Sequence, residues 1–273
     1  MAELPEIDKI SRQMNQTLPG KQIREIKILQ PKCSNLSEGE FRVRTAGSEI
    51  INVSNRGKWI AIHLSNQENI LLSCGLGADV LYFQSPGEMQ ARHHIQVQMT
   101  DGSGFTVRYW WFGWFQLLSD AGLEKDPRIR DIAPSPFQEE FTYEYFRNLF
   151  TGKRIRVKTM LLDQAKVSGI GNMYIQDIFF RSGLHPDQNS SAMEEEDFKL
   201  LYQSIQTQLE SSRDKGGCAY ELDFFGQKGG FGIEDFLIGY KEGEPCPRCG
   251  TEIRKIRLGG TASYFCPNCQ IKK

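Results

Sequence analysis

Residues 246–269 read CPRCGTEIRKIRLGGTASYFCPNC, and this segment contains two Cys-x-x-Cys pairs that are separated by sixteen residues. The four cysteines are Cys246, Cys249, Cys266 and Cys269. Four thiolates in two such pairs suit a tetrahedral zinc ion, and a site with four protein ligands leaves no open position for catalysis. Between the pairs, Gly259-Gly260 is typical of a two-residue hairpin turn. The segment therefore predicts a β-hairpin held by structural Zn²⁺, with unrelated CxxC pairs or a redox site as the alternative.

A second motif lies upstream, at residues 158–186, which read KTMLLDQAKVSGIGNMYIQDIFFRSGLHP. Its apolar spacing predicts a short helix, a turn at the GIGN sequence of residues 169–172, and a second helix from about Met173. The glycines allow a tight turn. N–H groups at the start of the second helix can hold a phosphate, and Asn172 adds a side-chain donor. A plain helical hairpin with no ligand is the alternative.

The charge of the chain is balanced overall but uneven along its length. Lys and Arg number 33 against 34 Asp and Glu, so the net charge of −1 excludes a uniformly basic nucleic-acid binder. Residues 151–186 hold six basic and two acidic side chains, and residues 241–273 hold seven and three, so each segment carries +4. Two such segments suit a phosphate-facing surface. A solvated charged face is the alternative.

The composition is that of a globular protein, with 39% hydrophobic and 25% charged residues. The first ten residues, MAELPEIDKI, lack the order of a signal peptide, and no stretch of 18 apolar residues occurs. We therefore expect a cytoplasmic protein with no membrane partner. The remaining cysteines, Cys33, Cys74 and Cys218, follow no ligand spacing and are expected to be small buried residues. No ligand spacing occurs among His63, His93, His94 and His185, which we interpret as structural or surface residues.

The pattern of elements predicts an α+β fold in three parts. Residues 1–133 combine a helix over Glu3–Leu18 with short alternating runs that predict a β-sandwich. The expected strands are Ile23–Leu29, Phe41–Arg44, Glu49–Val53, Trp59–Leu64, Ile70–Ser73, Ile95–Met99 and Phe105–Arg108. Residues 134–240 are expected to form a helical domain that ends in a glycine-rich loop over 216–240, and residues 241–273 the zinc hairpin. The expected helices are Glu139–Phe150, Lys158–Gln164, Met173–Ser182 and Glu194–Ser212.

Three features together resemble the formamidopyrimidine-DNA glycosylase and endonuclease VIII family. They are the motif of residues 158–186, the Cys-Pro-Asn-Cys-Gln ending at 266–270, and Glu3-Leu4-Pro5-Glu6 near the start. The resemblance keeps their order and covers essentially the whole chain. It implies an N-terminal β-sandwich, a helix–two-turn–helix domain, a zinc hairpin, and a DNA cleft between the two larger domains.

The resemblance also implies a reaction and its residues. Family members use the α-amine of residue 2, after Met1 is removed, to attack C1′ of a damaged nucleotide and form a Schiff base. An α-amine has a pKa of about 7.7–8, against about 10.4 for lysine, so more of it is nucleophilic at neutral pH. Carried over, Ala2 is the nucleophile, Glu3 the general acid/base, Glu6 a neighbouring carboxylate, and Lys58 a phosphate contact.

The resemblance implies DNA contacts in the other parts of the chain as well. Asn172 matches the asparagine of the helical turn, and Lys158 belongs to the same basic motif. Leu76 stands where the family has a wedging methionine, and Phe112 keeps the aromatic residue of a damage-reading loop. These residues, with Trp111 beside Phe112 and the basic Arg257 of the zinc hairpin, are the candidate DNA-binding set.

Five positions depart from the family pattern. Ala2 replaces proline, and Leu76 replaces methionine. The family's Arg-Arg-Phe-Gly run is Trp110-Trp111-Phe112-Gly113 here, so Trp111 replaces the arginine that contacts the orphaned base. Stacking by Trp111 would fill space without the base-edge hydrogen bonds of arginine. A buried core strand is the alternative for residues 110–115. The phosphate-gripping arginine of the hairpin corresponds to Thr261.

We therefore expect a DNA repair glycosylase that flips a damaged base, cleaves its N-glycosidic bond and nicks the abasic strand by β-elimination. The expected partner is double-stranded DNA with a damaged base or an abasic site, bound by a monomer. A second hypothesis is a catalytically impaired protein that binds damaged or branched DNA. A third is a cleft for another nucleic acid, such as RNA or a protein-linked end.

Overall fold

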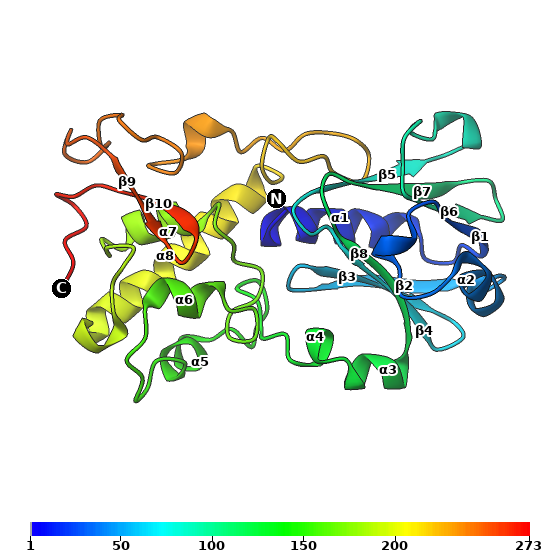
Figure 1. Ribbon diagram of the computed structural model, residues 1–273, viewed down its shortest axis with the longest axis horizontal. Helices are drawn as coiled ribbons and strands as arrows, with labels where there is room; N and C mark the ends of the chain where they lie inside the picture. The colour runs from blue at the N-terminus through cyan, green and yellow to red at the C-terminus, as the bar shows by residue number, and fades with distance from the viewer. Residues whose placement is uncertain (1) are drawn as a thin grey trace. The chain divides into compact units, whose positions relative to one another are not determined.

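The computed structural model describes residues 2–273, which form two compact units (Figure 1). The amino-terminal unit runs to Asp131 and also contains Lys215–Gly230, while the carboxy-terminal unit comprises Ile132–Asp214 and Phe231–Lys273. This division differs from the predicted boundaries in two respects. The glycine-rich segment is shared between the units, and the cysteine hairpin belongs to the same unit as the helices.

The amino-terminal unit contains two four-stranded antiparallel sheets, as the predicted sandwich requires. One sheet has the order β1-β6-β7-β5, with bounds Ile23–Ile28, Ile95–Met99, Gly104–Tyr109 and Ala78–Phe83. The other has the order β2-β3-β4-β8, with bounds Ile50–Arg56, Trp59–Leu64, Glu68–Ser73 and Trp114–Ser119. Alternating apolar residues of both sheets are buried in one core, so the strands face each other across it. Short connections are η1 (Pro31–Cys33), η2 (Pro86–Glu88), α3 (Asp120–Lys125) and α4 (Pro127–Arg130).

Helix α1 (Leu4–Thr17) confirms the predicted N-terminal helix. Its apolar residues Ile7, Ile10 and Met14 are spaced three to four apart and are fully or almost fully buried in the core of the sandwich. Phe224, which belongs to Lys215–Gly230, is also fully buried and packs its ring near those of Tyr82 and Phe105. The glycine-rich segment therefore completes this core from far along the chain.

The expected strand over Phe41–Arg44 is wrong, because these residues lie in helix α2 (Glu38–Thr45). Ser37 caps the helix with its hydroxyl, and the Glu40 carboxylate accepts a hydrogen bond from the Ser37 N–H at 2.8 Å. This reciprocal capping box fixes the helix start and outweighs the strand-like alternation of the short run. The prediction also missed β5 and β8, which are buried at consecutive positions and so lack simple alternation.

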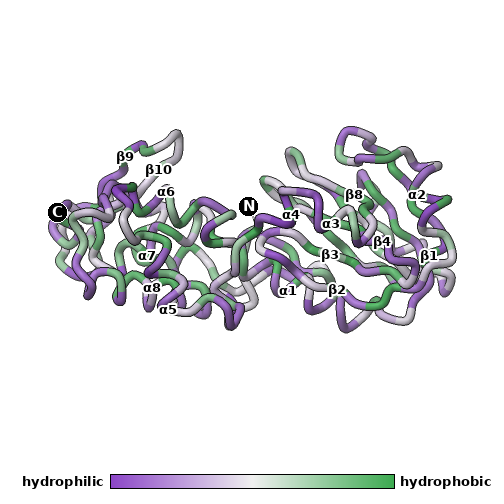
Figure 2. Tube along the Cα trace, turned by 90° about the horizontal axis from the view of Figure 1, so that it is seen from below, coloured by the Kyte–Doolittle hydropathy of each residue, from purple (hydrophilic) through white to green (hydrophobic). Residues whose placement is uncertain are grey.

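The carboxy-terminal unit contains helices α5 (Tyr143–Asn148), α6 (Val157–Leu162), α7 (Ile175–Arg181) and α8 (Glu195–Asp214), with η3 (Ser190–Ala192) and η4 (Ile233–Asp235). Helix α8 alternates hydrophilic and hydrophobic residues along its length, as expected for a helix with one buried face (Figure 2). Strands β9 (Arg254–Leu258) and β10 (Thr261–Phe265) form the predicted hairpin, and β10 packs against α7. The four predicted helices and the hairpin are thus confirmed, with shifts at their ends.

Asp177 ties helix α7 to the chain that leads into the hairpin. Its fully buried carboxylate accepts hydrogen bonds from the N–H groups of residues 237, 238 and 239 at 2.7–3.0 Å. Burial raises the pKa of Asp177, and these three backbone donors oppose that shift. Helix α7 therefore holds residues 237–239, which precede the hairpin in the chain. Among the described residues, no helix has both the length and the apolar character needed to span a membrane.

Candidate active site and four-cysteine centre

The start of helix α1 places two carboxylates in the interior of the amino-terminal unit. Glu3, the residue before the helix, is fully buried, and Glu6 is 4% exposed. One oxygen of Glu6 accepts the Glu3 N–H at 2.8 Å, and the other accepts the Cys218 N–H at 2.8 Å. Glu6 is therefore fixed by two backbone donors, one of which comes from a residue 212 positions away in the chain. Sequence reasoning could not find Cys218, because its contribution is a backbone N–H.

Lys58 joins these carboxylates from the turn between β2 and β3. Burial lowers the pKa of its ammonium, and the negative charges of Glu3 and Glu6 oppose that shift. The structure thus brings together Glu3, Glu6 and Lys58. A buried lysine with a lowered pKa is itself a competent nucleophile. Two amines therefore have to be distinguished at this site, that of Lys58 and that of residue 2.

Ala2 lies directly beside the carboxylate pair in the sequence and is 3% exposed, packed in the core of the sandwich. Met1 lies outside the described residues. Removal of residue 1 would convert the Ala2 nitrogen into a primary α-amine one residue from Glu3. The small, buried Ala2 side chain anchors that nitrogen, so the position of the amine is set by packing.

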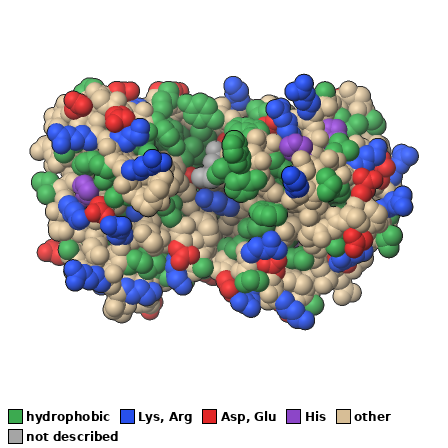
Figure 3. All heavy atoms as spheres, in the orientation of Figure 1, with side chains coloured by type: hydrophobic (Ala, Val, Ile, Leu, Met, Phe, Trp, Pro, Cys, Tyr) green, Lys and Arg blue, Asp and Glu red, His purple; other side chains and the backbone are tan. Residues whose placement is uncertain are grey.

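The aromatic loop, residues 110–113, connects β7 to β8, and its large side chains and that of Trp114, the first residue of β8, are exposed. Trp111 is 81% exposed and Phe112 50%, while Trp110 and Trp114 are exposed to 45% and 40%. The alternative of a buried core strand is therefore wrong for the large side chains of residues 110–112 and 114, whereas Gly113 and Phe115 are buried. Exposed hydrophobic side chains also gather on the visible face of this unit (Figure 3).

The β4–β5 loop, residues 74–77, packs against the aromatic loop. Its residue Leu76 is 46% exposed. The Trp110 N–H donates to the Gly77 carbonyl at 2.9 Å, and the Trp110 indole N–H donates to Asp79 at 2.9 Å. A side chain at Gly75 would lie 1.9 Å from the Phe112 carbonyl oxygen, so only glycine permits this approach. The two loops thus hold Leu76, Trp111 and Phe112 on one exposed apolar surface.

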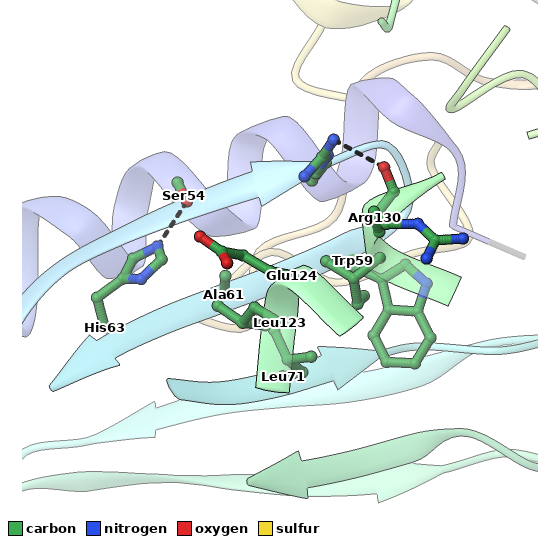
Figure 4. Close-up of a pocket in the computed structure, with 10 residues that line it drawn as sticks. Ser54, Trp59, Ala61, His63, Leu71, Leu123, Glu124 and Arg130 are labelled. Atoms are coloured by element: carbon green, nitrogen blue, oxygen red, sulfur yellow. Dashed lines mark hydrogen bonds between the residues drawn. The ribbon is translucent and has the colours of Figure 1, made fainter. Parts of the chain in front are cut away.

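A pocket of about 290 Å³ lies on the outer face of the second sheet, apart from the carboxylate pair (Figure 4). Trp59, Ala61 and Leu71 form its apolar floor, and Leu123 and Glu124 of α3 border it. His63 contacts the Ser54 hydroxyl through Nε2 at 3.1 Å and the Asn69 side-chain oxygen through Nδ1 at 2.6 Å. Both ring nitrogens are therefore engaged, which agrees with a structural role for His63.

In the carboxy-terminal unit, the turn before α7 is built by a residue that sequence analysis missed. The Gln164 amide donates to the carbonyls of Leu162 and Ile170 at 3.0 Å and accepts the Gly169 N–H at 2.8 Å. Gly169 has φ +90°, which requires glycine. Asn172 follows, half-buried, and its side-chain oxygen has no hydrogen-bond partner among the residues described. The helix begins at Ile175, two residues later than predicted.

Lys158 is buried and anchors the hairpin from α6. Its ammonium donates to Thr261 Oγ1 at 3.1 Å, the Ala262 carbonyl at 3.2 Å and Ser263 Oγ at 2.7 Å. It also borders a pocket of about 430 Å³ that Arg156, Leu258 and Thr261 help to line. A phosphate contact by Lys158 stays a prediction, and Arg257 lies exposed on β9.

The Lys158 contacts predict a measurable pH dependence of stability. Burial lowers the pKa of Lys158 from its ordinary value of 10.5 to about 8. Between pH 8 and pH 10.5, the unfolded chain therefore binds a proton at Lys158 that the folded chain does not bind. The contribution of Lys158 to stability therefore increases as pH rises from about 8 towards about 10.5. The unfolding free energies of the parent and of Lys158→Met are measured by denaturant titration at pH 7.5 and pH 9.5. The value of the parent minus that of the variant should be larger at pH 9.5 than at pH 7.5. A pH-independent difference would contradict this assignment.

The four cysteines form the predicted cluster at the base of the hairpin, and their Sγ atoms all lie within 4.8 Å of one another. Neighbouring Sγ atoms are 3.4–3.8 Å apart. Zinc–sulfur bonds of about 2.3 Å in a tetrahedron require sulfur separations of roughly 3.8 Å, so the cluster fits structural Zn²⁺. As predicted, Cys33, Cys74 and Cys218 are buried elsewhere.

Removal of one zinc ligand should unfold the hairpin, because β9 buries none of its five side chains fully and has little core of its own. We expect Cys266→Ser to lower the zinc content from about one ion per chain to a small fraction and to remove the amide-exchange protection of residues 254–265. Cys33→Ser is the matched control and should keep both. Full zinc content in Cys266→Ser would show that the Cys266 thiolate is not required as a zinc ligand.

Comparisons with known proteins cover the whole chain. The formamidopyrimidine-DNA glycosylase N-terminal domain matches residues 1–110, the formamidopyrimidine-DNA glycosylase H2TH domain residues 132–221, and the zinc finger found in FPG and IleRS residues 243–271. The chain is 31% identical to formamidopyrimidine-DNA glycosylase of Bacillus subtilis, with 100% of both chains covered, and 30% identical to that of Pelotomaculum thermopropionicum, with 99% covered.

Among solved structures, the chain is similar to Lactococcus lactis Fpg in complex with abasic-site DNA, with a TM-score of 0.89 and 25% identity over 99% of this chain and 100% of that one. It is similar to MutM in complex with DNA that contains carbocyclic 8-oxo-G, with a TM-score of 0.88, 25% identity and the same coverage. These matches agree with the order of the sandwich, the helical turn and the four-cysteine zinc hairpin. The chain belongs to the formamidopyrimidine-DNA glycosylase family.

Proposed function

We propose that this protein is a DNA glycosylase that releases a damaged base and then nicks the abasic strand. The observation that carries the proposal is the cluster of Glu3, Glu6 and Lys58 at the start of the chain. Together with the Ala2 nitrogen, this cluster would supply a nucleophile, a proton-transfer group and a cation, which base excision requires. The names of the curated relatives and the DNA ligands of the similar solved structures support the same reaction class.

In the proposed reaction, the Ala2 amine forms a bond to C1′ of the damaged nucleotide as the bond from C1′ to the base breaks. The base leaves with the electron pair of that bond and takes a proton. The attached nitrogen loses a proton, and the C1′–O4′ bond then breaks as O4′ takes a proton, which opens the sugar ring and leaves a protonated imine. Removal of a C2′ proton expels the 3′ phosphate and nicks the strand. Glu3 is the group that carries these protons, and Glu6, fixed by two backbone donors, keeps the helix start in place.

Cationic and amide groups of both units are proposed to bind the DNA backbone. Lys58 would pair with the phosphate beside the lesion, and the negative charges of Glu3 and Glu6 favour the protonated form of its ammonium against the effect of burial. Asn172 offers a side chain at the turn before α7, and Arg257 is an exposed cation on β9. Charge-assisted contacts of this kind position DNA without reading its sequence.

Leu76, Trp111 and Phe112 are proposed to fill the space left by the flipped nucleotide. They are large, apolar and exposed on neighbouring loops that pack on each other, so they can enter a base stack without unfolding the unit. An aromatic ring stacks on every base, whereas an arginine would bind base edges. We therefore propose that this protein distinguishes less strongly among the four possible bases opposite the lesion than a relative with arginine at this position would.

The proposal is tested with duplexes that contain 8-oxoguanine, a formamidopyrimidine, an oxidised pyrimidine or an abasic site. We expect release of at least one modified base and nicking of the abasic strand by protein whose chain starts at Ala2. Lesion-selective binding without any turnover would instead support the second candidate, a catalytically impaired damage-binding protein. Ala2 in place of proline and Trp111 in place of arginine are the observations that favour that candidate.

A further inference from the structure

One polar face of helix α1 contacts the returning segment, Lys215–Gly230, which belongs to the same unit. Glu6, Lys9 and Gln13 lie on this face, because residues spaced three and four apart in a helix are neighbours on its surface. Glu6 accepts the Cys218 N–H at 2.8 Å. Lys9 and Gln13 have no part in the proposed reaction, yet both contact the same segment.

Gln13 uses both ends of its side-chain amide. The amide oxygen accepts the Phe224 N–H at 2.9 Å, and the amide nitrogen donates to one carboxylate oxygen of Asp223 at 3.0 Å. Lys9 forms an ion pair with that same oxygen at 3.0 Å. The other Asp223 oxygen accepts two backbone N–H groups of its own turn at 2.8 and 3.0 Å. Asp223 is buried, so these donors stabilise its charge and fix the turn on the helix.

The two ends of the returning segment are joined at a neck. The Gly230 N–H donates to the Lys215 carbonyl at 2.7 Å. A side chain at Gly229 would lie 2.0 Å from the Gly217 carbonyl oxygen, so the two backbones touch and only glycine permits this approach. Cys218 follows Gly217 directly. A displacement of the turn at one end of this closed segment is therefore expected to reach the Cys218 N–H.

We propose that Gln13 and Asp223 are positioning residues for the active site. They hold the returning segment so that the Cys218 N–H stays on Glu6. Glu6 in turn accepts the Glu3 N–H, and this contact aligns the proton-transfer group. The catalytic part of this inference rests on the proposed function. Misplacement of a reacting group by about 1 Å can slow a reaction by about 10²-fold.

The experiment exchanges the donor and the acceptor of the contact between Gln13 and Asp223. Gln13→Glu keeps an acceptor for the backbone but brings two carboxylates together. Asp223→Asn keeps an oxygen for its own turn but directs an amide nitrogen at the Gln13 amide nitrogen. In the double variant, the introduced amide donates to the introduced carboxylate, so the hydrogen bond is restored with opposite polarity. Lys9 can pair with that carboxylate four residues along the helix.

Each single variant should release a modified base about 10-fold to 10²-fold more slowly than the parent in a single turnover. The protein is kept in large excess over its Kd, so weaker DNA binding cannot produce this loss. Amide exchange at Cys218, measured by NMR without DNA, should be faster in both single variants. The double variant should recover the rate and the protection of the parent.

Gln16→Glu is the matched control, because Gln16 is exposed on the same helix. It should keep the rate and the Cys218 protection of the parent. Single variants that match the parent in both measurements, or a double variant that is no better than either single variant, would overturn the positioning role.

Failure of the proposed function is a separate result, in which the parent neither releases a modified base nor nicks abasic DNA. Exchange at Cys218 then still decides whether Gln13 and Asp223 hold this N–H on Glu6, since that measurement needs no substrate. Unchanged exchange in both single variants would contradict the inference whether or not the parent is active.

Discussion

Replacement of Glu3 by glutamine is expected to slow base release by about 10²–10⁴-fold, the usual contribution of a positioned general acid/base. Glutamine keeps the size of the side chain and can still accept hydrogen bonds, but it cannot transfer a proton. Glu3 is fully buried beside the proposed nucleophile, so solvent buffer should not replace it. The measurement is single-turnover release of a modified base, with binding of the same duplex measured in parallel.

The control for this prediction is Asp8→Asn, which removes a carboxylate from the same helix, where Asp8 pairs with Arg12 on the helix surface. It should keep the parent rate within a small factor. The zinc content and unfolding midpoint of Glu3→Gln should match those of the parent. Base release at the parent rate by folded Glu3→Gln would remove Glu3 from the mechanism.

The second large effect is expected when the Ala2 amine is blocked. A chain that keeps one residue before Ala2 has an amide nitrogen at this position, and an amide cannot form an imine. Strand nicking at an abasic site and covalent trapping should both be abolished, while DNA binding should be retained. Two preparations of the same sequence, one starting at residue 1 and one at Ala2, provide the comparison, and mass spectrometry assigns each start.

Ala2→Pro is the matched variant for the blocked chain. It changes the side chain but leaves an amine at the processed N-terminus, so nicking should persist. Equal nicking by the blocked and the processed chains would show that another amine performs the reaction. Lys58 is the first candidate for that role, because burial lowers the pKa of its ammonium.

The parts of the fold that sequence could predict are those set by local patterns. The spacing of Ile7, Ile10 and Met14 fixes α1, and the two cysteine pairs around Gly259-Gly260 fix the hairpin. The wrong strand at residues 41–44 shows the limit of alternation over four residues, since a capping box at Ser37 selected a helix instead.

The sequence predicted only those parts of the site that depend on the identity of a side chain. Glu3, Glu6 and Lys58 were predicted from motifs, and the structure brings them together. The Cys218 N–H that fixes Glu6 could not be foreseen, because its segment is rich in glycine and any residue supplies an N–H. Gln164 was missed for a related reason, since its partners are backbone groups of the turn.

The exposure of the aromatic loop could not be decided from composition, because Trp and Phe are equally typical of a core strand. The structure resolves this through Gly75 and Gly77, which let the β4–β5 loop approach the backbone of residues 110–113. That approach leaves Trp111 with 81% of its surface exposed. The close packing of two loops, which depends on glycines far away in the sequence, thus creates an exposed apolar surface.

The most direct test of the mechanism is borohydride trapping on abasic-site DNA, followed by mass spectrometry of the adduct-bearing peptide. The protein must be shown beforehand to start at Ala2. We predict a covalent adduct on the N-terminal peptide, with the mass located on the Ala2 nitrogen. An adduct located on Lys58, or no adduct from protein that binds the same DNA, would contradict the assignment of the N-terminal amine as nucleophile.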